Sequence, residues 1–171
     1  MSTRLGITHL GESVPPCDDH CDIPVEIENV EKIVRAVKTP YYFHRTRKNE
    51  LIAKALFPPP EASEVSVVRH IMGDDYCAER SRETGSAGEY AGMLVLVTGD
   101  VRQVGSDVYD YRADYCGHAH INHGIKMPAP GETMSPQDRD ALNERCKAIL
   151  KLGAFHTDPA ATGQGWQGSP L

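Results

Sequence analysis

The segment from Cys116 to His123 holds the densest group of chemically versatile side chains in the sequence, one cysteine and three histidines. In a strand, side chains alternate between two faces, so the cysteine and the first two histidines would share one face and the intervening Ala119 the other. Imidazoles and thiolates are preferred zinc ligands, and a histidine can also exchange a proton near neutral pH. Three interpretations stay open: a zinc site, an acid–base or substrate-contacting site, and a strand of hydrogen-bonded structural histidines. The candidate zinc ligands are Cys116, His118, His120 and His123, and His118 is the leading catalytic candidate.

A basic turn is predicted at residues 43–48, where the sequence FHRTRK concentrates three positive charges beside His44. Guanidinium groups bind phosphate oxygens through paired hydrogen bonds, and a neighbouring histidine can transfer a proton. The turn therefore predicts either a phosphate-binding site, with His44 as a second catalytic candidate, or a basic turn that faces solvent. Arg69 follows a predicted strand, where it either reaches solvent or pairs with an acid such as Asp74 or Asp75. The candidate ligand-binding residues are Arg35, Arg45, Ser66 and Arg69.

The cluster CDDHC at residues 17–21 offers two thiols and one imidazole to a metal ion. Its spacing is less typical of zinc than Cys-x-x-Cys, so an acidic, solvated arm is the alternative. The five cysteines are an odd number, and the N-terminal sequence lacks the apolar stretch of a signal peptide. We therefore expect reduced thiols and a cytoplasmic location.

Length and composition limit the class of protein. The 171 residues fit one domain, and 40% apolar and 25% charged residues are typical of a globular chain. A formal net charge of −6 argues against broad, non-specific binding of nucleic acid, which depends on many cations. No apolar run reaches the roughly 18 residues that cross a bilayer, so no membrane partner is expected. The sequence has no G-x-S-x-G elbow, Walker loop, Rossmann glycine fingerprint or H-E-x-x-H motif, which disfavours the enzymes that use them.

The elements that must position these residues follow one another without regular βα alternation, which predicts an α+β fold. We expect a single domain with a small mixed or antiparallel sheet and a few helices. Apolar residues at helical spacing predict a helix over 27–37, with a shorter helix followed by a strand at 41–43 as the alternative. A long loop is expected between 72 and 92. The other expected elements are a short helix at 49–56 and strands at 64–71, 93–98, 104–111 and 117–121.

The clearest predicted helix is near the C-terminus. It begins at Ser135 or Pro136, which suit its cap and first turn, and ends near Gly153. Its apolar stripe contains Leu142, Cys146 and Ile149. Around this fold we expect residues 1–24 to form a loosely ordered arm, residues 25–155 the domain, and residues 156–171 a flexible tail.

Four segments resemble a group of small, largely uncharacterised bacterial proteins. They are IVRAVKTPYYF at 33–43, FPPP at 57–60, VSVVR at 65–69 and HAHI at 118–121. The resemblance covers about residues 27–121 and implies one shared domain, in the setting of a bacterial conflict or defence system. It assigns no reaction, and it directs attention to Arg35, Ser66, Arg69 and His118.

A fainter likeness is to ADP-ribosyltransferase-type toxins, in which a first strand with His or Arg and a later strand with Ser hold NAD. The matching positions here are His44, Arg45, Thr46 and Ser66. The late glutamate motif of these toxins has no clear counterpart, and Glu132 is only a distant candidate. This likeness implies NAD-dependent transfer as a further alternative.

Two functional hypotheses follow. The first is a cytoplasmic bacterial protein that recognises a phosphorylated ligand, a nucleotide or a nucleic-acid end, with His118 and His120 as acid–base or metal groups. The second is a non-enzymatic module, in which the prolines at 57–60 and the segment around Trp166 bind a partner protein and the histidines are structural. An enzyme should gather His44, Arg69 and His118 around one cleft, whereas a binding module should leave them apart.

Overall fold

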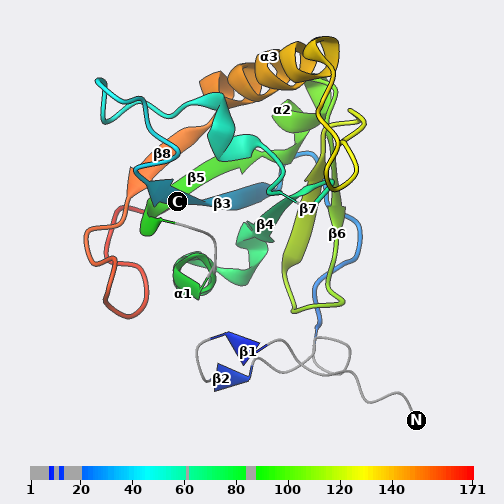
Figure 1. Cartoon of the computed structure of the whole chain (residues 1–171). Coiled ribbons are helices and arrows are strands. Elements are labelled where there is room, and N and C mark those ends of the chain that lie inside the picture. The colour runs from blue at the N-terminus through cyan, green and yellow to red at the C-terminus, as the bar shows by residue number, and fades with distance from the viewer. Residues whose placement is uncertain (1–7, 10–11, 14–20, 61, 84–87) are drawn as a thin grey trace.

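A six-stranded antiparallel sheet forms the centre of the computed structural model, which describes residues 8–9, 12–13, 21–60, 62–83 and 88–171. The strand order is β6-β7-β4-β3-β5-β8, and every neighbouring pair is antiparallel (Figure 1). The chain is therefore an α+β domain with an antiparallel sheet, as predicted. The strands are β3 (Lys32–Thr39), β4 (Val65–Arg69), β5 (Glu89–Val97), β6 (Asp107–Asp110), β7 (His118–Asn122) and β8 (Ala154–Thr157), with a separate short pair β1 (Thr8–His9) and β2 (Glu12–Ser13).

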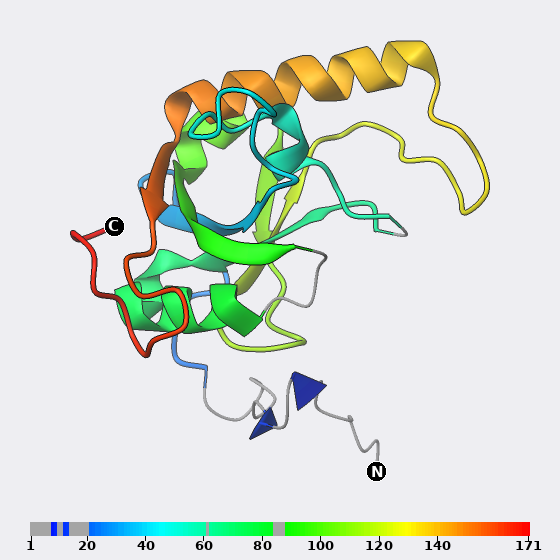
Figure 2. The same ribbon diagram turned by 60° about the vertical axis from the view of Figure 1, so that its left-hand side comes forward.

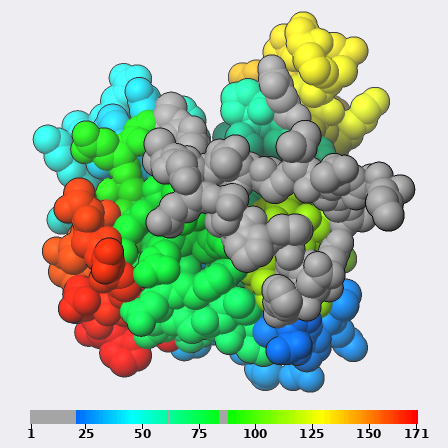
Figure 3. Space-filling view, turned by 90° about the horizontal axis from the view of Figure 1, so that it is seen from below, coloured from blue at the N-terminus to red at the C-terminus, as the bar shows by residue number. Residues whose placement is uncertain are grey.

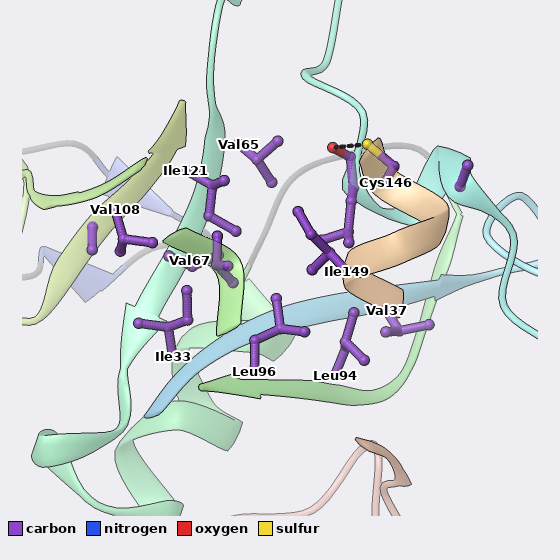
Figure 4. Packing of buried hydrophobic residues seen from close by; sticks show 14 of the residues in the cluster. Ile33, Val37, Val65, Val67, Leu94, Leu96, Val108, Ile121, Cys146 and Ile149 are labelled. Atoms are coloured by element: carbon purple, nitrogen blue, oxygen red, sulfur yellow. Dashed lines mark hydrogen bonds between the residues drawn. The ribbon is translucent and has the colours of Figure 1, made fainter. Parts of the chain in front are cut away.

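Helices cover both faces of the sheet. On one face lie α3 (Pro136–Leu152) and α2 (Thr98–Gln103), and on the other lies α1 (Asp74–Glu83) (Figure 1). The larger core lies on the α3 side, where side chains from the sheet meet Cys146 and Ile149 (Figure 4). A smaller core on the α1 side contains Cys77 and Ala78. Because successive strand residues point to opposite faces, each central strand contributes to both cores.

The C-terminal helix has the cap and the buried stripe that the sequence predicts. Ser135 Oγ accepts a hydrogen bond from the backbone N–H of Asp138 at 3.1 Å, and Pro136 occupies the first turn. The helix ends at Leu152, one residue before Gly153. The buried residues of α3 are Leu142, Cys146 and Ile149.

The helix predicted over 27–37 is wrong, because Lys32–Thr39 is strand β3. This strand is buried on both faces, so its apolar residues form a nearly continuous run that also fits helical spacing. The predicted loop at 72–92 contains α1, which buries only Cys77, Ala78 and Ser81. Such small buried side chains give no apolar stripe in the sequence. The helix expected at 49–56 is reduced to a 3₁₀-helix at Ala53–Leu56.

The segment expected to form a flexible tail packs against the domain in the structure. Strand β8 pairs with β5, and Arg82 on α1 donates hydrogen bonds to the carbonyls of Gly163 and Gly165 at 3.0 and 2.7 Å. Trp166 and Leu171 pack in the smaller core. Figure 3 shows the tail (red) lying beside α1 (green) on this face. The domain therefore extends to the last residue of the chain.

The N-terminal boundary of the domain also differs from the expected residue 25. Cys21 forms a disulfide with Cys116, with their Cα atoms 5.4 Å apart. The expectation of reduced thiols is therefore wrong for this pair, because the fold brings together two cysteines that are 95 residues apart in sequence. Cys77 and Cys146 are free and buried. Cys17 and most of the predicted arm lie outside the described residues.

In the part of the chain that the structure describes, no helix combines the length and the hydrophobicity that crossing a membrane requires.

The Leu142→Ala substitution should lower the free energy of unfolding by about 2–5 kcal/mol, because it removes buried methyl groups and leaves a cavity under α3. Leu152→Ala is the matched control, because Leu152 lies on the same helix and is 52% exposed. Urea unfolding of both variants measures the effect. If both variants lost the same free energy of unfolding, burial of Leu142 would contribute no more to stability than an exposed leucine does.

Candidate functional site

Two of the four histidines predicted to do chemistry, His118 and His120, lie with Ser66 on the α1 side of strands β4, β6 and β7. The antiparallel register places Ser66 opposite His120, and Tyr109 opposite His120 on its other side. Ala119 and Ile121 point into the larger core, so the predicted alternation along β7 is confirmed. We call this group the histidine–tyrosine cluster. Its members are Glu64, Ser66, Tyr109, Tyr111, Tyr115, His118 and His120.

His118 is a buried, neutral member of the cluster. Its Nε2 lies 2.6 Å from Ser66 Oγ, and its ring stacks on Tyr115 with centroids 4.5 Å apart. Burial, followed by the nearby His120 and Arg80, lowers the pKa of His118 to about 3. Asp114 Oδ2 is 3.2 Å from Nδ1, yet within the described part of the chain Nδ1 has no hydrogen bond of good geometry. A histidine with this pKa does not exchange protons near neutral pH. Its contacts are those of a structural histidine that orients Ser66.

His120 is held differently, by a carboxylate that the sequence analysis missed. Its Nδ1 lies 2.7 Å from Oε2 of Glu64, which also accepts from the hydroxyl of Tyr109, while Asn122 donates to Oε1 at 2.9 Å. Burial opposes the charge of Glu64, but these three hydrogen bonds outweigh it and lower the pKa of the carboxyl. In the neutral form of His120, an ionised Glu64 fixes the ring proton on Nδ1, so Nε2 carries a free lone pair. Nothing in the sequence distinguishes Glu64 from other glutamates.

The four predicted zinc ligands do not converge. Cys116 is bonded to Cys21. His123 points into the opposite, larger core side, where its ring nitrogens contact Ser106 Oγ and the carbonyl of Leu56, both at 2.8 Å. Among the residues described here, no group of three or more His, Cys, Asp or Glu side chains could hold a metal ion. The zinc-site interpretation is therefore withdrawn for these residues.

Two of the predicted ligand-binding arginines are engaged within the fold. Arg35 donates to the carbonyls of Ala55 and Ser66 at 3.1 and 3.0 Å and to the hydroxyl of Tyr42 at 3.2 Å. Arg69 forms ion pairs with Glu31 and Asp110 at 2.6 and 2.7 Å and is fully buried. These partners occupy the donors that a phosphate would need, so we assign both arginines a structural role.

The basic turn contributes to a cleft on the α3 side of the sheet. His44 is partly buried, and its Nδ1 accepts hydrogen bonds from the backbone N–H groups of Thr46 and Arg47, each at 3.2 Å. Arg45, the next residue, is exposed. The cleft has a volume of about 720 Å³ and is lined by residues from 44–53 and from the C-terminal half of α3. Figure 2 shows that the chain of these two segments runs close together. We call it the basic cleft. Its lining includes His44, Arg47, Asn49, Glu50, Leu94, Asn143, Lys147, Leu150, Lys151 and Phe155.

The candidate site residues are thus divided between two faces. His44 lies on the α3 side, and His118 and Ser66 lie on the α1 side. Arg69 belongs to neither surface. The single cleft expected for an enzyme that uses His44, Arg69 and His118 together is therefore not formed. Ser66 and His44 likewise do not face one pocket, which removes the geometric basis for the toxin-like NAD site.

Comparison of the chain with protein-family models, curated proteins and solved structures finds no significant match.

The pKa of His118 predicts a measurable acid sensitivity. Above pH 6.5 the ring is neutral in both states, but as the pH falls toward 3 the unfolded chain takes up a proton that the folded chain does not. Between pH 6 and pH 4 the free energy of unfolding of the native protein should therefore fall by about 2 kcal/mol more than that of a His118→Asn variant. Urea unfolding at both pH values provides the comparison. Parallel pH profiles would mean that His118 is solvated and titrates normally.

Proposed function

We propose that the protein recognises a phosphorylated ligand, a nucleotide or a nucleic-acid end, in the basic cleft. The observation that carries this proposal is the arrangement of cations on two walls of the cleft above an apolar floor. Arg47 lies on the wall formed by the basic turn, and Lys147 and Lys151 lie on the wall formed by α3. The two lysines are four residues apart, so they project from the same side of the helix.

The charges of the cleft favour an anion. Three cations line it against one carboxylate, Glu50. Arg47 pairs with Glu50, and Lys147 pairs with Glu144 at 3.2 Å, but these side chains are mostly exposed. Exposed ion pairs contribute little free energy, so a phosphate can replace the carboxylate without a large penalty. Lys151 is exposed and has no ion-pair partner among the described residues.

The floor and the size of the cleft suit a ligand with a ring. Leu150 and Phe155, which are both partly exposed, supply apolar surface, and Phe155 contacts Phe43 edge-on at a centroid distance of 5.5 Å. A nucleobase gains stability from packing on such a surface. The volume of about 720 Å³ lies within the range of about 300–1,000 Å³ that is typical of small-molecule sites. The amides of Asn49 and Asn143 can hydrogen-bond to the polar groups of a base or sugar.

A protein partner is the second candidate, and a separate groove supports it. This groove of about 510 Å³ is lined by aromatic rings and prolines, with Lys54 near the ring of Tyr41 at 5.5 Å. Aromatic side chains beside a fixed, extended backbone resemble the grooves that bind proline-rich peptides. Trp166 takes no part in this surface, because it is packed beside α1. The lining residues are Tyr41, Tyr42, Lys54, Phe57, Pro58, Pro59, Pro60, Ala62, Met127 and Pro128.

Charge reversal at Lys151 tests the cleft. The Lys151→Glu variant should bind adenosine 5′-monophosphate at least tenfold more weakly than the native protein, a loss of about 1.4 kcal/mol, because an attractive charge becomes repulsive. Isothermal titration calorimetry at low ionic strength measures the change. Lys126→Glu is the matched control, with the same charge change at an exposed residue outside the cleft. Equal weakening by both variants would indicate a general charge effect and would argue against a site in the cleft.

A further inference from the structure

We propose that the histidine–tyrosine cluster is a second ligand site, which takes an uncharged nucleoside. The flat base would stack on Tyr111, and a hydroxyl of the sugar would donate a hydrogen bond to Nε2 of His120. This site lies on the opposite face of the sheet from the basic cleft and does not depend on the function proposed there.

The ring of Tyr111 provides a rigid and accessible platform. It lies parallel to His120 within 13°, with centroids 4.1 Å apart, and the residue is 40% exposed. His120 is itself fixed through Glu64, so the stack beneath the platform cannot turn freely. A base packed on an aromatic ring gains about 1–3 kcal/mol, and every base has a face that can do this.

A hydrogen-bond acceptor of known orientation lies beside the platform. In the neutral imidazole of His120, Glu64 holds the ring proton on Nδ1, which leaves Nε2 as an acceptor. Among the described residues, Nε2 of His120 has no hydrogen-bond partner. The atom is not buried, so solvent reaches it. The side chain of His120 is 17% exposed. A ligand that donates to Nε2 therefore displaces only water.

The geometry of the stack selects the shape of the ligand. A ligand ring on the outer face of Tyr111 is separated from His120 by the tyrosine ring. Atoms of that ligand ring therefore cannot hydrogen-bond to Nε2, which lies in the plane of the imidazole. The donor must be on a substituent that extends past the edge of Tyr111. A nucleoside meets this requirement, because its hydroxyl groups are carried on a sugar attached to the flat base.

The charge of the surface disfavours a phosphate. Glu64 is ionised, and its described partners Tyr109, His120 and Asn122 are not Lys or Arg. Asp114 has no Lys or Arg partner within the described part of the chain either. The nearby Arg80 is already occupied, because it stacks on Tyr115 and pairs with Glu83 at 3.2 Å. A phosphate would therefore meet carboxylates without a free cation to balance it.

The test is calorimetric titration of the full chain with adenosine, guanosine, cytidine and uridine, each compared with its 5′-monophosphate. We expect at least one nucleoside to bind, and we expect Tyr111→Ala to weaken that binding by at least fivefold while Tyr111→Phe, which keeps the ring, retains it. His120→Ala should also weaken binding, whereas His156→Ala on the edge strand β8 should not. Thermal unfolding of each variant checks that the fold is intact.

Further variants separate this site from the basic cleft. Lys151→Glu should leave nucleoside binding unchanged, and Tyr111→Ala should leave nucleotide binding in the cleft unchanged. The proposal is overturned if none of the four nucleosides binds, or if Tyr111→Ala binds as well as the native protein. It is also overturned if Tyr111→Phe loses binding as strongly as Tyr111→Ala, since stacking would then not be the source of affinity.

Discussion

The buried guanidinium of Arg69 connects three strands of the central sheet with the segment that precedes β3. It ends β4, forms ion pairs with Glu31 before β3 and with Asp110 at the end of β6, and donates to the carbonyl of Pro24. Burial alone would lower the pKa of Arg69, but the hydrogen bonds to Glu31 and Asp110 outweigh it and raise the pKa. Removing one partner of such a buried pair typically costs about 3–5 kcal/mol, because the other charge is left unpaired. Arg69 therefore fixes the ends of three strands and the N-terminal segment together.

Around this centre, the alternation of side chains along each strand makes two surfaces of different chemistry. Val65 and Val67 of β4 point into the larger core under α3, while Ser66 between them joins the histidine–tyrosine cluster on the α1 side. The surface near α3 has lysines and an arginine at its rim, and the cluster near α1 has carboxylates and tyrosines. The structure thus separates a surface lined by lysines and an arginine from one lined by carboxylates and tyrosines. A single small ligand cannot contact both surfaces, because the sheet lies between them.

Features encoded within a few residues could be predicted from the sequence. The Ser135 cap and the Leu142 stripe define α3, and the two-residue period of β7 places His118 and His120 on one face. Features that depend on distant residues could not. The role of Glu64 arises only because β4 and β7 become neighbours, and the Cys21–Cys116 disulfide joins residues far apart in sequence. Trp166 docks on a core formed by α1, whose small buried residues carry no apolar signal of their own.

The proposed separation of two ligand surfaces is tested most directly by amide NMR of the uniformly ¹⁵N-labelled chain, titrated with adenosine 5′-monophosphate. Binding in the basic cleft predicts chemical-shift changes in residues 44–53 and 143–155, with the amides of Ser66, Tyr111 and His118 unchanged. Shift changes confined to Ser66, Tyr111 and His118 would contradict the assignment of the phosphate to the α3 side of the sheet.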